Sequence, residues 1–286
     1  MSILHVIILA IVQGLAELLP VSSSAHVIVA EKLMGMNPSA PKMTLLLVML
    51  HTGTMLAVIV YFWPRWRRTF FHSVAEFKRF VVALVVATFL TGLVGGGIIE
   101  FIEKVLMRHQ RHAWVEQLFS HLGLISAALA VAGVFILVAG LLERRRSQTM
   151  AAHELTPRQY GWIGAIQGLC IPFRGFSRSG ATISTALALR VARSSAEDFS
   201  FALAVVLTPP AVAREVWRLY QAQHHRLAAV LPAAMPSFLG MVFAFLAGLV
   251  ALKWLSGWLE RGRWHFFGIY CLFAAIVVGY LQYSGF

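Results

Sequence analysis

Two polar side chains lie one helical turn apart in the apolar first part of the sequence. Gln13 and Glu17 are four residues apart, so they share one face of a helix. Their oxygen atoms together could bind Mg²⁺ or Ca²⁺, because hard cations take oxygen ligands in proteins. The alternative is a hydrogen bond between the two side chains that only packs the helix. An ionisable side chain such as Glu17 in an apolar segment is a functional candidate by default.

A turn rich in serine follows, from Pro20 to His26, and it contains Ser22, Ser23 and Ser24. These hydroxyl groups and the imidazole could supply a nucleophile and a general acid or base. Serine also caps helices frequently, and His26 could be a packed histidine at the membrane interface. Taken alone, capping is the more common explanation for such a turn.

A second polar cluster combines glycines, hydroxyl groups and arginines, and a helix is predicted to begin within it. Glycines let the backbone approach a ligand closely. Amide groups at the helix N-terminus and the guanidinium group of Arg178 are typical of a phosphate site. The alternative is that Arg178 pairs with an acid such as Glu17, which would also bring the two clusters together. The predicted phosphate-binding residues are Arg174, Gly175, Ser177, Arg178, Ser179 and Thr182.

The composition indicates that a membrane protein positions these clusters. The chain has 286 residues, 59% hydrophobic and 13% charged, and its mean hydropathy is +0.75. The charged fraction is about half that of a soluble domain, and the composition excludes disordered, collagen-like and disulfide-rich proteins. Six apolar stretches are long enough to span a bilayer. They are residues 43–63, 80–101, 117–142, 197–219, 229–255 and 264–283.

Both polar clusters lie in apolar regions, residues 2–34 and 159–191, that are interrupted by proline, glycine or serine. Each half of these regions is too short to cross the bilayer, which predicts two re-entrant helical hairpins. Irregular backbone at membrane depth must be enclosed by protein or line a wet cavity. The first apolar stretch contains Glu17, which a signal peptide would not need, so we expect it in the mature protein.

The two interrupted regions also resemble each other, since the segment at 11–15 (IVQGL) is echoed at 165–169 (AIQGL). Three predicted spans separate them, so the second hairpin must enter from the opposite face. We therefore predict an all-α, polytopic fold with an inverted-topology repeat in a single membrane domain, residues 1–286. The repeats cover about 1–142 and 159–286, and their hairpins should meet at a midplane site.

The net charge is +12, from 24 Lys and Arg against 12 Asp and Glu. We expect most of this excess to orient the protein by the positive-inside rule. That places both termini and the entrance of the first hairpin on the outer face. His51 and the pair Glu197 and Asp198 occupy related positions in the two halves, and could line the site or be structural. The predicted loops after the first, third and fifth spans hold Arg65, Arg67, Arg68, Lys78, Arg79, Arg144, Arg145, Arg146, Arg158, Arg261 and Arg263.

Together these clusters resemble the two signatures of the undecaprenyl-diphosphatase family, integral membrane phosphatases that recycle the C55 lipid carrier of cell-wall synthesis. The first signature is an acidic residue or Gln, then Glu four residues later, then a Pro-Val-Ser-Ser-x-x-His loop. It is matched by Gln13, Glu17, Pro20, Ser22, Ser23 and His26. The second is Pro-Gly-x-Ser-Arg-Ser-x-x-Thr. It is matched by Gly175, Ser177, Arg178, Ser179 and Thr182, with Arg174 in place of the proline.

The resemblance covers most of the chain, and implies hydrolysis of undecaprenyl pyrophosphate to undecaprenyl phosphate and inorganic phosphate. It implies a divalent cation, Mg²⁺ or Ca²⁺, at Glu17 and Gln13. It also implies a multi-pass protein of the bacterial inner membrane whose active site opens to the periplasmic face. Gln13 removes a negative charge from the metal site and Arg174 adds a cation beside the phosphate, departures that would suit a divergent paralogue. The implied catalytic residues are Glu17, Ser23, His26 and Arg178, with His26, Ser23 or an activated water as the attacking group.

The main alternative function is a transporter or lipid flippase, because inverted repeats with broken helices are a transporter architecture. Ser23 and His26 beside the phosphate site favour hydrolysis. Another class of membrane lipid phosphatase carries a histidine six residues after the arginine of its Ser-Arg motif, but Ser184 occupies that position here. We expect a polyprenyl pyrophosphate lipid and the bilayer as partners and no nucleic acid, and we leave open a homodimer.

Overall fold

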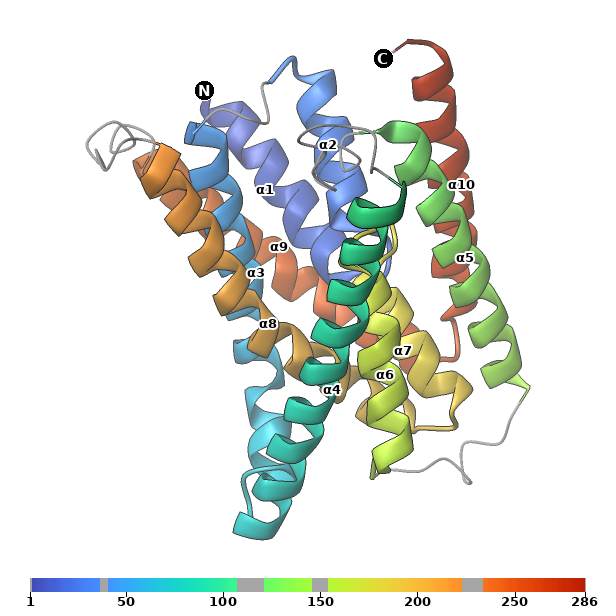
Figure 1. Cartoon of the computed structure of the whole chain (residues 1–286). Coiled ribbons are helices and arrows are strands. Elements are labelled where there is room, and N and C mark those ends of the chain that lie inside the picture. Colours follow the sequence, from blue (N-terminus) through green and yellow to red (C-terminus); the bar gives the residue numbers. More distant parts are fainter. Residues whose placement is uncertain (1, 37–40, 107–120, 146–153, 223–233, 286) are drawn as a thin grey trace.

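The computed structural model describes residues 2–36, 41–106, 121–145, 154–222 and 234–285. Within these ranges every regular element is a helix. The helices form a bundle in which α1 begins and α10 ends at the same end of the molecule (Figure 1). The elements are α1 (Ile3–Leu18), α2 (Ser23–Leu33), α3 (Pro41–Thr69), α4 (Val74–Phe101), η1 (Ile102–Leu106), α5 (Leu122–Arg144), α6 (Pro157–Leu169), α7 (Arg178–Ala188), α8 (Arg193–Ala222), α9 (Ala234–Glu260) and α10 (His265–Tyr283).

Six of these helices are long and apolar enough to cross a membrane, which confirms the predicted all-α, multi-pass fold. Most of them extend beyond the predicted boundaries, because apolarity marks the bilayer depth and not the ends of a helix. The predicted starts at residues 117 and 229 lie outside the described residues. The candidate spans are Met43–Thr69, Val74–Val105, Leu122–Arg144, Arg193–Gln221, Ala234–Glu260 and His265–Tyr283.

The basic loop predicted after the first span was wrong. Helix α3 continues through Pro64 to Thr69, and α4 begins at Val74, so only a short turn joins them. Arginine and lysine are good helix formers, so a helix that leaves the bilayer need not end there. The basic side chains Arg65, Arg67, Arg68, Lys78 and Arg79 therefore lie on the two helices.

Arg65 links α3 to the start of α8 instead of pointing into a loop. Its guanidinium group donates to Asp198 at 2.6 Å and to Glu197 at 2.9 Å. Both carboxylates are buried, and Ser256 of α9 also donates to Glu197. Glu197 and Asp198 therefore join three helices, and within the described residues they form no contact with Glu17 or Arg178. This contact supports the structural alternative for this pair.

The two interrupted regions form two pairs of short helices, α1 with α2 and α6 with α7. These helices have 16, 11, 13 and 11 residues, fewer than the ~20 needed to span a bilayer. Helix α1 packs against α9, and α6 packs against α4. Gly164 is required at the second contact, because a Cβ there would lie 2.3 Å from the Ala87 carbonyl oxygen. Re-entry into the membrane and the inverted repeat stay predictions.

Candidate active site

Glu17 is the centre of a polar group at the end of α1. Gln13, one turn earlier, donates from Nε2 to Glu17 Oε2 at 3.2 Å. Ser23, the first residue of α2, donates from Oγ to the same oxygen at 2.5 Å. His51 of α3 lies with Nε2 3.8 Å from it. Three helices therefore converge on one carboxylate, whose side chain is only 19% exposed.

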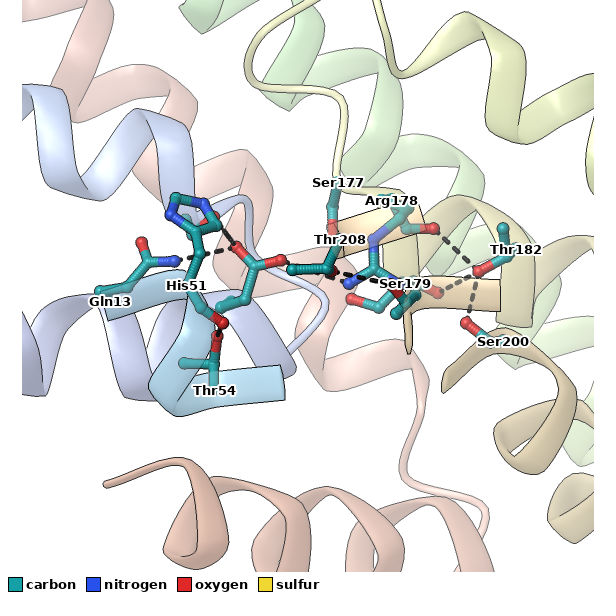
Figure 2. A network of polar contacts seen from close by, with 12 residues as sticks. Gln13, His51, Thr54, Ser177, Arg178, Ser179, Thr182, Ser200 and Thr208 are labelled. Atoms are coloured by element: carbon teal, nitrogen blue, oxygen red, sulfur yellow. Dashed lines mark hydrogen bonds and ion pairs between the residues drawn. The ribbon is translucent and has the colours of Figure 1, made fainter. Parts of the chain in front are cut away.

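Arg178 approaches the other oxygen of this carboxylate from α7. Its Nη2 atom lies 3.3 Å from Glu17 Oε1, across 161 positions of sequence. Nη1 is buried and has no hydrogen-bond partner. Figure 2 shows the resulting network, with Gln13 and His51 on one side and Arg178 and Thr182 on the other. The ion pair between Arg178 and Glu17, one of the two alternatives considered from the sequence, is present. The Nη1 nitrogen of the guanidinium group remains available to a ligand.

The hydroxyl groups around Arg178 hold its loop and helix in place. Ser177 caps α7, since its Oγ accepts from the Gly180 amide at 3.2 Å. Ser179 donates to the Leu19 carbonyl oxygen at 3.4 Å, which ties the second loop to the first. Thr182 is fully buried, and its Oγ1 lies 2.6 Å from Ser200 Oγ. The structure thus brings these predicted residues close to Glu17. Their hydroxyl groups form hydrogen bonds with other protein groups.

His26 lies one turn after Ser23 and makes a different set of contacts. Its Nδ1 atom donates to the Ser22 carbonyl oxygen at 2.8 Å, so the neutral ring accepts at Nε2. Tyr270 of α10 donates its hydroxyl to that nitrogen at 2.8 Å. Ser22 has φ of +67°, an uncommon backbone conformation for a residue other than glycine. Within the described residues, His26 has no hydrogen bond or ion pair with Glu17, Ser23 or Arg178.

Arg174 and Gly175 lie within the loop that joins α6 to α7. Gly175 has φ of +105°, and a Cβ there would lie 2.5 Å from the Ile125 carbonyl oxygen of α5, so only glycine fits. Arg174 is exposed and acts electrostatically on Glu31 near the end of α2. Burial raises the pKa of Glu31, which lies outside the six spanning helices, to about 7, although the Arg174 charge lowers it. Arg174 therefore acts on a carboxyl group of α2 and not on Glu17.

A small cavity of about 10 Å³, about the size of one water molecule, lies beside the Glu17–Arg178 pair. It is therefore too small for a pyrophosphate group unless the Glu17–Arg178 pair separates. The lining residues are Glu17, Leu18, Thr54, Met55, Val58, Arg178, Ala204, Val205 and Thr208.

Sequence reasoning missed the contributions of Thr208, Ser200 and Tyr270. Thr208 belongs to no motif, and its hydroxyl group donates to the Ala204 carbonyl oxygen of its own helix. Ser200 follows the acidic pair in the same helix. Tyr270 belongs to no motif, and only the packing of α10 against the first loop reveals it.

The chain is similar to known proteins along most of its length. Residues 6–277 match the family model described as bacitracin resistance protein BacA. The chain belongs to the BacA family. Among relatives of this BacA family member, the undecaprenyl-diphosphatase 2 of Acinetobacter baylyi is 54% identical over 283 residues, 97% of this chain and 98% of the relative. The undecaprenyl-diphosphatase 1 of Burkholderia pseudomallei is 32% identical over 287 residues, 96% and 95% of the two chains.

Proposed function

We propose that this protein hydrolyses undecaprenyl pyrophosphate to undecaprenyl phosphate and inorganic phosphate, and so recycles the lipid carrier of cell-wall synthesis. The Glu17–Arg178 pair carries this proposal, because it sets a carboxylate and a guanidinium group with a spare nitrogen between two loops of an apolar bundle. The names of the relatives supply the substrate. These names favour hydrolysis over lipid transport.

Arg178 and Glu17 neutralise each other in the structure. Substrate binding would therefore replace the contact of Arg178 with Glu17 by contacts with the phosphate. Arg178 would release Glu17 and turn both guanidinium nitrogens to phosphate oxygens, a fork geometry that suits phosphate. The Nη1 atom is already without a partner, so binding satisfies it. Arg178 would then face the charge that builds up on the phosphoryl oxygens in the transition state.

Glu17, Gln13 and Ser23 offer the oxygen atoms that a hard cation prefers, so the residues fit a bound Mg²⁺ or Ca²⁺. Glu17 is the one carboxylate among them, and no group of three or more His, Cys, Asp or Glu side chains occurs among the described residues. Such a site would be completed by substrate phosphate and water. A bound cation would neutralise phosphate charge and polarise the phosphoryl group.

Ser23 and Glu17 have the geometry of a nucleophile and its base, with the hydroxyl hydrogen directed at the carboxylate. In this scheme Ser23 Oγ attacks the terminal phosphorus, its proton passes to Glu17, and the bond to the bridging oxygen breaks, releasing undecaprenyl phosphate. A water oxygen then attacks the phosphorus of the phosphoserine, inorganic phosphate is released, and Ser23 Oγ takes back a proton from Glu17. His26 and Tyr270 form a separate hydrogen-bonded pair that orients the imidazole beside this turn.

The charge distribution supports a proposed location for the site. Helix α1 begins and α10 ends at one end of the molecule, and α3 and α4, which carry basic side chains on both sides of their short turn, meet at the opposite end (Figure 1). With those basic side chains in the cytoplasm, we propose that the protein lies in the inner membrane and that Ser23 is reached from the periplasmic face. A homodimer stays a prediction.

The test is phosphate release from C55 pyrophosphate by the purified protein in detergent with Mg²⁺. Release that Arg178→Gln abolishes supports the proposal. Movement of intact lipid pyrophosphate across a reconstituted bilayer, with no phosphate released by the wild type, would establish the flippase alternative instead.

A further inference from the structure

A second, larger cavity lies where α5, α9 and α10 meet. Its volume is about 560 Å³, within the range of small-molecule sites. It shares no lining residue with the cavity at Glu17 and Arg178. The lining residues are Arg144, Trp258, Arg261, Gly262, Arg263, His265 and Phe266.

Two glycines bring these residues together. Gly140 of α5 faces the start of α10, where a Cβ would lie 2.6 Å from the His265 backbone nitrogen. The helices therefore touch, and Arg144, one turn beyond Gly140, reaches the same cavity as His265. Gly262 has φ of +67° and turns the chain sharply between α9 and α10.

The cavity carries positive charge that no carboxylate of the described residues balances at ion-pair distance. Neither Arg144, Arg261 nor Arg263 forms a salt bridge within that part of the chain. The neighbouring acid Glu143 is taken by Arg193 at 2.7 Å. The carboxylate of Glu260 is exposed and also forms no ion pair there. Three guanidinium groups are therefore available at one concave surface.

His265 forms part of the cavity wall beside the arginines. The residue is 8% exposed, and its Nδ1 atom is buried with no hydrogen-bond partner. The backbone of Gly262, which also lines the cavity, interacts with the imidazole. His265 therefore contributes to the wall of the cavity through its ring, and the buried Nδ1 atom does not face the open space.

Aromatic rings extend from the cavity to the outer surface of the bundle. Trp258 contacts Trp254 with ring centroids 5.2 Å apart, and Phe266 with centroids 5.6 Å apart. Trp254 and Phe266 are both 44% exposed on the faces of α9 and α10. Such rings suit the level of lipid headgroups. A molecule with a phosphate at one end and acyl chains at the other matches this combination of charge and rings.

We propose that this cavity binds the phosphate group of an anionic phospholipid from the leaflet at the basic end of the bundle. The arginines contact the phosphate oxygens, and the acyl chains follow Trp254 and Phe266 along the surface. The same phosphate chemistry could be supplied by free inorganic phosphate. The proposal depends on membrane embedding and not on the proposed catalytic function.

The test uses the delipidated full-length protein in a neutral detergent, titrated with short-chain phosphatidylglycerol, short-chain phosphatidylcholine or inorganic phosphate. Binding is read by native mass spectrometry and by thermal shift. The variant combines Arg261→Gln with Arg263→Gln, two exposed positions in the turn. The matched control combines Arg67→Gln with Arg68→Gln near the end of α3, which removes the same charge outside the cavity.

Phosphatidylglycerol should bind more tightly than phosphatidylcholine, and the turn variant should weaken it about tenfold or more while the control leaves it unchanged. Preferential binding of inorganic phosphate, lost in the same variant, would assign the phosphate site to the free ion and overturn the lipid assignment. If phosphatidylglycerol binding weakens equally in the turn variant and in the control, binding depends only on the overall positive charge of the protein, and the proposed site is refuted. Absence of any anion binding would overturn it as well. Phosphate release by the turn variant is measured in a separate assay. The lipid-binding result can therefore be interpreted even if the catalytic proposal fails.

Discussion

The ion pair between Glu17 and Arg178 can be tested by neutralising each charge alone and both together. These variants distinguish a pair that only stabilises the fold from a pair that takes part in catalysis. The variants are Glu17→Gln, Arg178→Gln and the double substitution. The paired side chains are 19% and 21% exposed. Removing one partner of a fully buried pair costs about 3–5 kcal/mol, so each single variant here should lose about 1–3 kcal/mol of stability. The double variant should regain most of that loss, because it leaves no unpaired charge.

Activity should behave differently from stability. Removing a charged donor from a transition-state site costs about 10²–10³-fold in kcat, so Arg178→Gln should lose at least that factor. The double variant should be no more active than either single variant. Phosphate release from C55 pyrophosphate and thermal unfolding in the same detergent measure the two quantities.

Arg193→Gln is the matched control. Arg193 forms an ion pair with Glu143 at 2.7 Å, with side chains 19% and 4% exposed, and lies outside both cavities. It should lose comparable stability and keep normal kcat. If the double variant at residues 17 and 178 recovers activity along with stability, the pair is only a structural tie and the catalytic assignment is refuted.

Three further outcomes are expected. Tyr270→Phe removes the hydroxyl group donated to His26 while keeping the ring, so kcat should fall about tenfold with an altered pH profile and little change in thermal stability; an unchanged pH profile would show that the contact only packs α10. Glu31→Gln should stabilise the protein at pH 8, because a carboxyl group whose pKa is raised from 4.5 to about 7 on folding costs stability increasingly as pH rises through that window; the difference in unfolding temperature should disappear by about pH 4.5, and a constant difference contradicts the pKa. A chelator should abolish phosphate release without lowering the unfolding temperature, Mg²⁺ or Ca²⁺ should restore it, and Gln13→Glu should lower the cation concentration required by adding a carboxylate beside Glu17; release that persists in the chelator would remove the metal from the scheme.

Much of the bundle could be predicted from the sequence, because membrane spans follow from apolar length alone. The six spans were recovered, and the two interrupted regions became short helices. The helix ends were not recovered, as the continuation of α3 through Pro64 to Thr69 shows. Local composition does not reveal tertiary contacts such as the ion pair between Arg65 of α3 and Asp198 of α8.

The sequence motifs identified most of the candidate site residues, but they did not identify the residues that contact them. Gln13 and Glu17 could be paired from helical spacing, and their hydrogen bond is present. The partners of Thr182 and His26 could not, because Ser200 and Tyr270 lie 18 and 244 positions away on other helices. Nothing in the spacing of a single chain specifies which helices pack together.

The sequence by itself determined an apolar, six-span helical protein with two polar loops that carry an acid, hydroxyl groups and an arginine, since residue type and periodicity suffice for these features. Tertiary structure alone decided that Glu17 and Arg178 meet across 161 positions, that one guanidinium nitrogen is left without a partner, and that Arg144 and His265 share a second cavity. The physical reason is packing. Glycines such as Gly140 and Gly164 let particular helices approach closely, and those approaches place distant side chains within bonding distance.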